Sequence, residues 1–272
     1  MNTRRLAQLA GVTRYEFLLV WRGKIMLVML GMLLVMCVIF FGPMYDVLQH
    51  AQMLAGVEAF PPETKADMSR TFASMVWGPL CITLAGVLPI LASDMIPKDR
   101  QYRVYPLLES MPLPTGVYLL GKLLGLWLSA LSGLVVIMVS VGIIFWWLLD
   151  GFDPRPYLEI WGIGALSLLI LNGGLAVLLP CGLSNRRAAL ILMAVVMGGA
   201  LFLGGEGVWV YLNPIRAPIV MHYFTGFIPE RPELISHFTG RDVFLSVGAG
   251  AAELVVFGAL AWGWLRRGFE RT

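Results

Sequence analysis

The sequence predicts an all-α integral membrane protein with six transmembrane helices, both termini inside (N-in/C-in), and an N-terminal amphipathic interfacial helix. Three observations lead to this prediction: 58% of the 272 residues are hydrophobic, only 14% are charged, and the mean hydropathy is +0.77. Soluble domains usually carry about 25% charged residues. The apolar residues also gather in runs long enough to cross a bilayer. We therefore expect a single transmembrane domain over residues 1–272.

Residues 4–22 are predicted to form a helix that lies on the membrane surface. At about 100° per residue, its apolar side chains cluster on one face and its polar ones on the other. The apolar face consists of Leu6, Leu9, Ala10, Thr13, Phe17, Val20 and Trp21. A basic amphipathic helix of this kind settles among lipid headgroups. The alternative is a solvated helix, which would leave Phe17 and Trp21 exposed to water.

Six apolar runs follow, and each is long enough for a hydrocarbon core of ~30 Å at ~1.5 Å per residue. They span residues 25–45, 72–93, 123–149, 160–180, 188–205 and 243–265. The segment 206–242 between the last two runs is rich in aromatic residues and is broken by Pro214 and Pro218. We expect it to form short helices in the outer leaflet or, with equal weight, an ordinary connecting loop.

The distribution of charge predicts which ends of the spans face the cytoplasm. If the N-terminus is inside, the inner segments hold 14 of the 20 basic residues and five acidic residues. The outer segments then hold six basic and 11 acidic residues, and Glu253 lies within the last span. Because basic residues mark cytoplasmic loops, we expect six spans with both termini inside.

Small residues recur along one side of the third span. Gly121, Gly125, Ser129 and Gly133 follow one another at intervals of four residues. Small side chains at this spacing form a groove that lets another helix approach closely. The pattern indicates helix packing, and the groove could receive another span of this chain or a second copy.

The polar segment 94–125 lies between two apolar runs and carries a recognisable pattern. The residues that form this pattern are Asp99, Arg100, Leu107, Leu108, Ser110, Pro112, Leu113, Tyr118, Leu119, Leu120, Gly121 and Lys122. With these residues the segment resembles the cytoplasmic loop of the permease subunits of ABC-2 type ABC transporters, which ends in an aliphatic stretch and Leu-Gly-Lys. The chain departs from the family at Arg103, Val104 and Pro106, where the family usually has Gly-Thr and a Glu.

The resemblance implies a six-span permease subunit of a bacterial ABC transporter, most often an exporter, in the plasma membrane (bacterial inner membrane, multi-pass). Its expected partners are a separate ATP-binding cassette ATPase subunit, which would bind ATP and Mg, a second permease copy as homodimer or heterodimer, and membrane lipid, with no nucleic acid. The loop 94–115 would transmit motion from the ATPase to the spans. Its candidate coupling residues are Arg100, Tyr102, Arg103, Tyr105, Leu107, Leu108, Glu109, Ser110 and Pro112. Their aromatic, apolar and Arg side chains are the types that dominate interface energies.

No motif predicts catalysis, a cofactor or a metal site in this chain, so we expect it not to be an enzyme. Gly116, Gly121 and Lys122 match part of a phosphate-binding loop, but Leu123 replaces the Ser or Thr that would hold magnesium. A stripe of Met residues in the first span is typical of apolar packing. Any ATPase activity should therefore belong to another polypeptide.

Glu253 is the candidate for an intramembrane polar site, because a carboxyl group inside a span is costly. It could lie on a substrate or proton path, or be a protonated group that hydrogen-bonds to a neighbouring helix. This leaves two alternative functions: a secondary transporter that uses Glu253, and a membrane assembly factor without transport. A secondary transporter would favour inverted internal repeats. We find no such repeat in the sequence.

Overall fold

The structure is a computed structural model that describes a defined part of the chain. The described residues are 3–23, 30–31, 35, 39, 42, 45–46, 73, 77, 80, 84–86, 88–90, 92–101, 113–148, 153–202, 213 and 240–269. Every regular element within these residues is helical, which confirms the all-α prediction for this part of the chain.

The helices follow the order of the predicted segments. They are α1 (Thr3–Trp21), α4 (Met95–Gln101), α6 (Thr115–Leu148), α7 (Pro154–Leu178), the short 3-10 helix η1 (Leu179–Gly182), α8 (Arg186–Phe202) and α11 (Gly240–Phe269). Helix α1 matches the predicted interfacial helix to within one residue at each end. The predicted first and second spans, 25–45 and 72–93, lie largely outside the described residues, and those of their residues that are described are helical except for Ser93, which is in a turn.

Three of the described helices are long and apolar enough to cross a membrane. These segments are Thr115–Trp147, Tyr157–Gly182 and Val247–Arg266, and they correspond to the predicted third, fourth and sixth spans. Helix α8 corresponds to the predicted fifth span, which was also the shortest, and it has 17 residues. The chain is therefore a membrane protein with at least these three apolar helices of spanning length.

Several helices begin earlier than the apolar runs predicted. Helix α6 begins at Thr115 rather than at residue 123, and the backbone N–H groups of Val117 and Tyr118 both donate to the carbonyl of Pro114. Helix α7 begins at Pro154 rather than at residue 160. There the side chain of Asp153 caps the helix by accepting from the N–H of Arg155. In α7, a polar cap and a proline in the first turn start the helix before its apolar residues begin.

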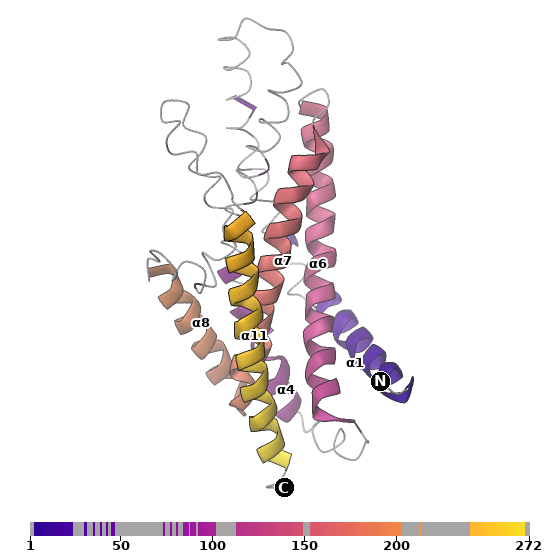
Figure 1. The fold of residues 1–272 in the computed structure, drawn as a ribbon, viewed down its shortest axis with the longest axis vertical. Coiled ribbons are helices and arrows are strands. Elements are labelled where there is room, and N and C mark those ends of the chain that lie inside the picture. The colour runs from indigo at the N-terminus through magenta and orange to yellow at the C-terminus, as the bar shows by residue number, and fades with distance from the viewer. Residues whose placement is uncertain are drawn as a thin grey trace, which may run out of the picture.

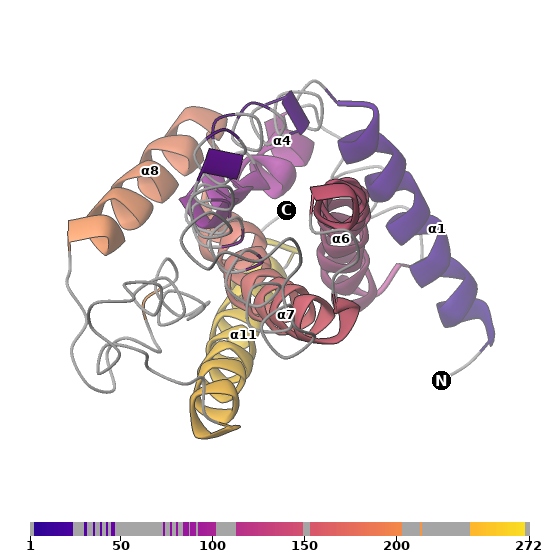
Figure 2. The same cartoon turned by 90° about the horizontal axis from the view of Figure 1, so that it is seen from above.

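Helices α6, α7 and α11 run side by side along the long axis of the molecule, while α8 leans away from α11 and α1 crosses α6 (Figure 1). The view from above shows α1 on the outer side of α6, on the opposite flank from α8 (Figure 2). Both termini lie toward the lower end in Figure 1, together with α4 and the start of α6. We call this the terminal end of the molecule.

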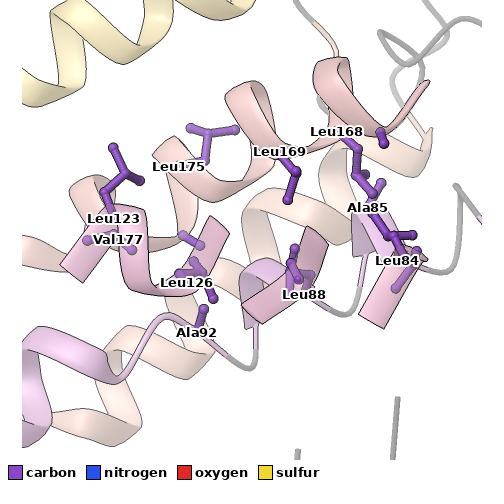
Figure 3. Packing of buried hydrophobic residues seen from close by; sticks show 14 of the residues in the cluster. Leu84, Ala85, Leu88, Ala92, Leu123, Leu126, Leu168, Leu169, Leu175 and Val177 are labelled. Carbon is purple, nitrogen blue, oxygen red and sulfur yellow. The ribbon is translucent and has the colours of Figure 1, made fainter. Parts of the chain in front are cut away.

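The core lies where α6 and α7 meet the described residues of the second apolar run. Figure 3 shows Leu84, Leu88 and Ala92 of this run beside Leu168 of α7 and Leu126 of α6. On either side of Leu168 in α7, a Cβ added at Gly164 or Gly173 would overlap the indole ring of a neighbouring Trp, so only glycine fits at these two positions. The apolar sequence runs thus pack into one helical bundle.

Candidate functional site

Lys122 lies in the second turn of α6 with its side chain only 2% exposed. Its ammonium is 2.5 Å from Glu16 Oε1 and 2.8 Å from Asp99 Oδ2, and it also donates to the main-chain oxygen of Met95 at 3.3 Å. An ammonium has three donors, so these acceptors satisfy all of them. A buried charge is tolerated only when it is paired and hydrogen-bonded in this way.

Tyr118 completes the group one helical turn before Lys122. Its hydroxyl donates to Asp99 Oδ2 at 2.7 Å, and Lys122 Nζ lies 5.4 Å from the centre of its ring. We call Glu16, Asp99, Tyr118 and Lys122 the polar cluster. It joins three helices that are far apart in sequence, since Glu16 comes from α1, Asp99 from α4, and Tyr118 and Lys122 from α6.

Glu16 reaches the polar cluster because α1 packs directly onto the backbone of α6. A Cβ added at Gly121 would lie 2.6 Å from Val12 Cγ1, and one added at Gly125 would lie 2.5 Å from Glu16 Cβ. One turn farther, Ser129 Oγ lies within hydrogen-bond distance of the carbonyls of Gly125 and Phe17. The small-residue groove predicted from the sequence therefore receives the interfacial helix, neither of the two occupants considered above.

Helix α4 is held at the terminal end by two further contacts. Asp94, which precedes α4, forms an ion pair of 2.6 Å with Arg186 in the first turn of α8. Arg100 donates from Nη1 to the carbonyl of Leu183, between η1 and α8, at 3.3 Å. Together with Asp99, these contacts attach α4 to α6 and to the start of α8.

Two carboxylates share one ammonium in the polar cluster, and the more deeply buried of them is Glu16. The side chain of Glu16 is 5% exposed and that of Asp99 is 21% exposed. Burial raises the pKa of the Glu16 carboxyl above its ordinary value, while Lys122 opposes the shift and Asp99 adds to it. A proton on Glu16 would leave one positive and one negative charge in the cluster, which is the arrangement least costly to bury.

The chemistry of the polar cluster is that of a structural link. The ammonium of Lys122 is fully engaged, and the acids around it serve as its acceptors. Breaking one partner of such a buried pair costs about 3–5 kcal/mol. The cluster can therefore keep α1, α4 and α6 together under an applied force.

Of the coupling residues predicted from the sequence, the structure describes only Arg100. Arg100 is described and contacts Leu183. Tyr102, Arg103, Tyr105, Leu107, Leu108, Glu109, Ser110 and Pro112 lie outside the described residues. The two ends of their segment, Gln101 and Leu113, are described, and each leads into a helix bound to the polar cluster.

Glu253, the predicted intramembrane polar residue, lies in the middle of α11 and is half-buried. The polar cluster contains none of α11, so these two candidate sites are separate. The segment 206–242, which the sequence predicts to face outward, lies outside the described residues except for Asn213 and the first residues of α11. Asn213 is buried and donates to the carbonyl of Ala200 in the last turn of α8 at 2.9 Å.

The partial match to a phosphate-binding loop lies on a continuous helix. Gly116, Gly121 and Lys122 all belong to α6, and the Lys122 ammonium is already bound. A phosphate-binding loop requires a turn whose N–H groups converge on the ligand. Among the described residues, no three His, Cys, Asp or Glu side chains come together as a metal site.

The ion pair between Glu16 and Lys122 was not predicted from the sequence. A signal was present, because Glu16 borders the apolar face of the predicted helix and is the only acid between residues 3 and 21. An acid beside an apolar face needs a buried cation as its partner. Two of the residues that carry the family resemblance, Asp99 and Lys122, prove to be partners in space.

Comparison with known proteins adds no identification. No protein-family model matches the chain, and no curated protein matches it.

Proposed function

We propose that this chain is the membrane-spanning permease subunit of an ABC-2 type transporter, an exporter in the plasma membrane that is powered by a separate ATPase subunit. Nucleotide binding and hydrolysis belong to that subunit in this proposal, and the chain itself catalyses no reaction. Two permease copies and two ATPase subunits make up the transporter, as the sequence resemblance implies.

The observation that carries the proposal is the polar cluster. A permease without its own nucleotide site needs a segment that receives motion from its partner and passes it to the spans. The segment 102–112 connects α4 to α6, and Asp99 of α4 is bound to Lys122 and Tyr118 of α6. Lys122 is in turn bound to Glu16 of α1.

The contacts of α4 extend this link to the fifth predicted span. Asp94 is paired with Arg186, and Arg100 contacts Leu183, so a displacement of α4 also acts on the start of α8. Charge-assisted hydrogen bonds are about twice as strong as neutral ones. A force applied to segment 102–112 would thus reach α1, α6 and α8 as one unit, which is what a coupling element must do.

The experiment is to express the chain with a candidate ATPase subunit that co-purifies with it and to replace Tyr105 and Leu108 together by Ala. This double variant keeps every charge that determines membrane orientation. It should insert normally and yet lose co-purification of the ATPase or stimulation of ATP hydrolysis by transported substrate, because interface anchors are each worth about 2 kcal/mol or more.

The matched control replaces Tyr15 and Leu19 of α1 by Ala. Both are exposed and lie outside the coupling segment, so ATPase association should remain as in the wild type. Wild-type association and transport in the Tyr105/Leu108 double variant would refute the coupling role. Transport driven by an ion gradient without any ATPase would instead support the secondary transporter that uses Glu253.

A further inference from the structure

A groove of about 780 Å³ lies between α1 and α6. It is lined by Leu6, Leu9, Ala10, Thr13, Arg14 and Phe17 of α1 and by Leu124, Leu128, Leu131, Ser132 and Val135 of α6. Its volume is within the range of ~300–1,000 Å³ typical of ligand sites. Nearly all of the lining is apolar, and Arg14 provides its one charge.

The dimensions of the groove match one leaflet of a membrane. Its α6 wall extends from Leu124 to Val135, which at ~1.5 Å per residue is roughly 16 Å. Half of a hydrocarbon core of ~30 Å is about 15 Å. Because α6 has the length and hydropathy of a spanning helix, this wall faces acyl chains rather than water.

The charge on α1 indicates which headgroup the groove would accept. Its cations Arg4, Arg5 and Arg14 are all exposed, whereas its only acid, Glu16, is buried against Lys122. All of the exposed charges on α1 are therefore positive. Arginine binds phosphate through two parallel hydrogen bonds, and basic residues at a membrane surface attract anionic lipid.

We propose that the groove between α1 and α6 is a binding site for an anionic phospholipid. One acyl chain lies along α6 from Leu124 to Val135, and the phosphate is bound by Arg14 at the rim. This inference does not depend on the proposed transport function, because it rests on α1, α6 and the membrane alone. The lipid would fill the apolar groove and so support the packing of α1 on Gly121 and Gly125.

The test is photo-crosslinking from inside the groove. A benzophenone amino acid replaces Leu131 in the full chain, which is reconstituted in phosphatidylcholine vesicles with a minor fraction of phosphatidylglycerol. A second variant of the full chain carries the benzophenone at Ile143 instead, which is an exposed position on the same helix and does not line the groove. Mass spectrometry then gives the ratio of the two lipids in the adducts at each position.

At Leu131 the adducts should be enriched in phosphatidylglycerol by about five-fold over the bilayer, which corresponds to ~1 kcal/mol for one Arg near the surface. At Ile143 they should follow the bilayer ratio. Arg14→Gln should abolish the enrichment at Leu131, whereas Arg5→Gln, on the same helix but outside the groove, should retain it.

Three results would overturn the proposal. Equal ratios of phosphatidylglycerol to phosphatidylcholine in the adducts at Leu131 and Ile143 would mean that the groove holds ordinary bilayer lipid only. This comparison uses the protein with Arg14 unchanged. An equal loss of enrichment in Arg5→Gln would assign the effect to the general surface charge of α1. Adducts at Leu131 with a peptide of this chain or of a second copy would show that protein fills the groove.

Discussion

The ammonium of Lys122 lies 2.5 Å from the carboxyl of Glu16, although the two residues are 106 positions apart in the chain. Neither side chain has appreciable contact with solvent, and the backbone around them is brought together by Gly121 and Gly125. The pair therefore fixes α1 to α6 at one register. This arrangement predicts how the stability of the protein changes when Glu16 or Lys122 is replaced, or when Gly125, which contacts α1, is replaced by a larger residue.

Lys122→Met should destabilise the protein by about 3–5 kcal/mol, because Glu16 would remain buried without its cation. Glu16→Gln combined with Lys122→Met should cost less than the sum of the two single changes, since the pair is then removed together. The measurement is unfolding in a denaturant series in mixed micelles. Arg187→Met is the control, because it removes an exposed charge near the same end of the molecule.

The stability that α1 gains from docking should decrease as the pH rises. Burial raises the pKa of Glu16 above its ordinary value of 4.5, so the folded state binds this proton more tightly than the unfolded state does. The resulting stabilisation is complete below the unfolded pKa and is lost as the pH rises through the higher folded pKa. Hydrogen exchange of the α1 amides across this pH range measures it.

Glu16→Gln should flatten this pH dependence, because the amide has no proton to lose. Glu159→Gln is the matched control, since Glu159 is exposed and its only described ion pair is a surface contact with Arg155 in the same helix. It should keep the wild-type profile. Exchange that slows with increasing pH, after correction for the intrinsic chemical rate, would contradict the assignment of the proton to Glu16.

The sequence predicted most of the helices that the structure describes, because hydropathy and helical periodicity are local properties. It placed the start of α6 eight residues too late, since Lys122 interrupts the apolar run and its charge is compensated only by distant residues. Local patterns contain no information about such compensation. Only the assembled fold reveals that Lys122 is buried.

The candidate site was predictable to a smaller degree. The small residues at four-residue spacing correctly indicated a close helix contact, but their partner is α1, and Glu16 was the one residue of α1 that pointed to a buried cation. The resemblance identified Asp99 and Lys122 without their pairing. The coupling residues from Tyr102 to Pro112 stay a prediction, because they lie outside the described residues.

The orientation predicted from the charges can be tested with single cysteines in a background that lacks Cys37, Cys81 and Cys181. Cysteines at Thr64 and Glu233 should react with a membrane-impermeant thiol reagent in intact cells, whereas those at Ser110 and Thr272 should react only after permeabilisation. Labelling at Ser110 in intact cells would reverse the orientation. The two pairs of positions serve as controls for one another.

Glu253→Gln should preserve assembly and most of the transport activity if the carboxyl is a neutral packing group. The amide can still donate and accept hydrogen bonds, and it needs no proton to remain uncharged. The measurement is transport in vesicles alongside the amount of assembled protein. Complete loss of transport with normal assembly would instead place Glu253 on a proton or substrate path and favour the secondary transporter.

Gly125→Ala should displace α1 from α6, since the added Cβ would lie 2.5 Å from Glu16 Cβ and 3.0 Å from the carbonyl of Thr13. The Thr13 carbonyl belongs to the backbone of α1 and cannot move by a change of rotamer. Overpacking of this kind typically costs about 1–3 kcal/mol. We expect faster hydrogen exchange throughout α1 and a lower midpoint of unfolding.

Gly116→Ala provides the matched control, because it makes the same substitution in the first turn of the same helix, where a Cβ would meet no atom within 4 Å. Alanine favours helix over glycine by about 1 kcal/mol, so this variant should be as stable as the wild type or more so. The same preference of alanine for helix applies at Gly125, where it offsets part of the destabilisation that the clash causes. If Gly125→Ala also stabilises the protein and leaves exchange in α1 unchanged, then α1 does not pack against α6 at this position.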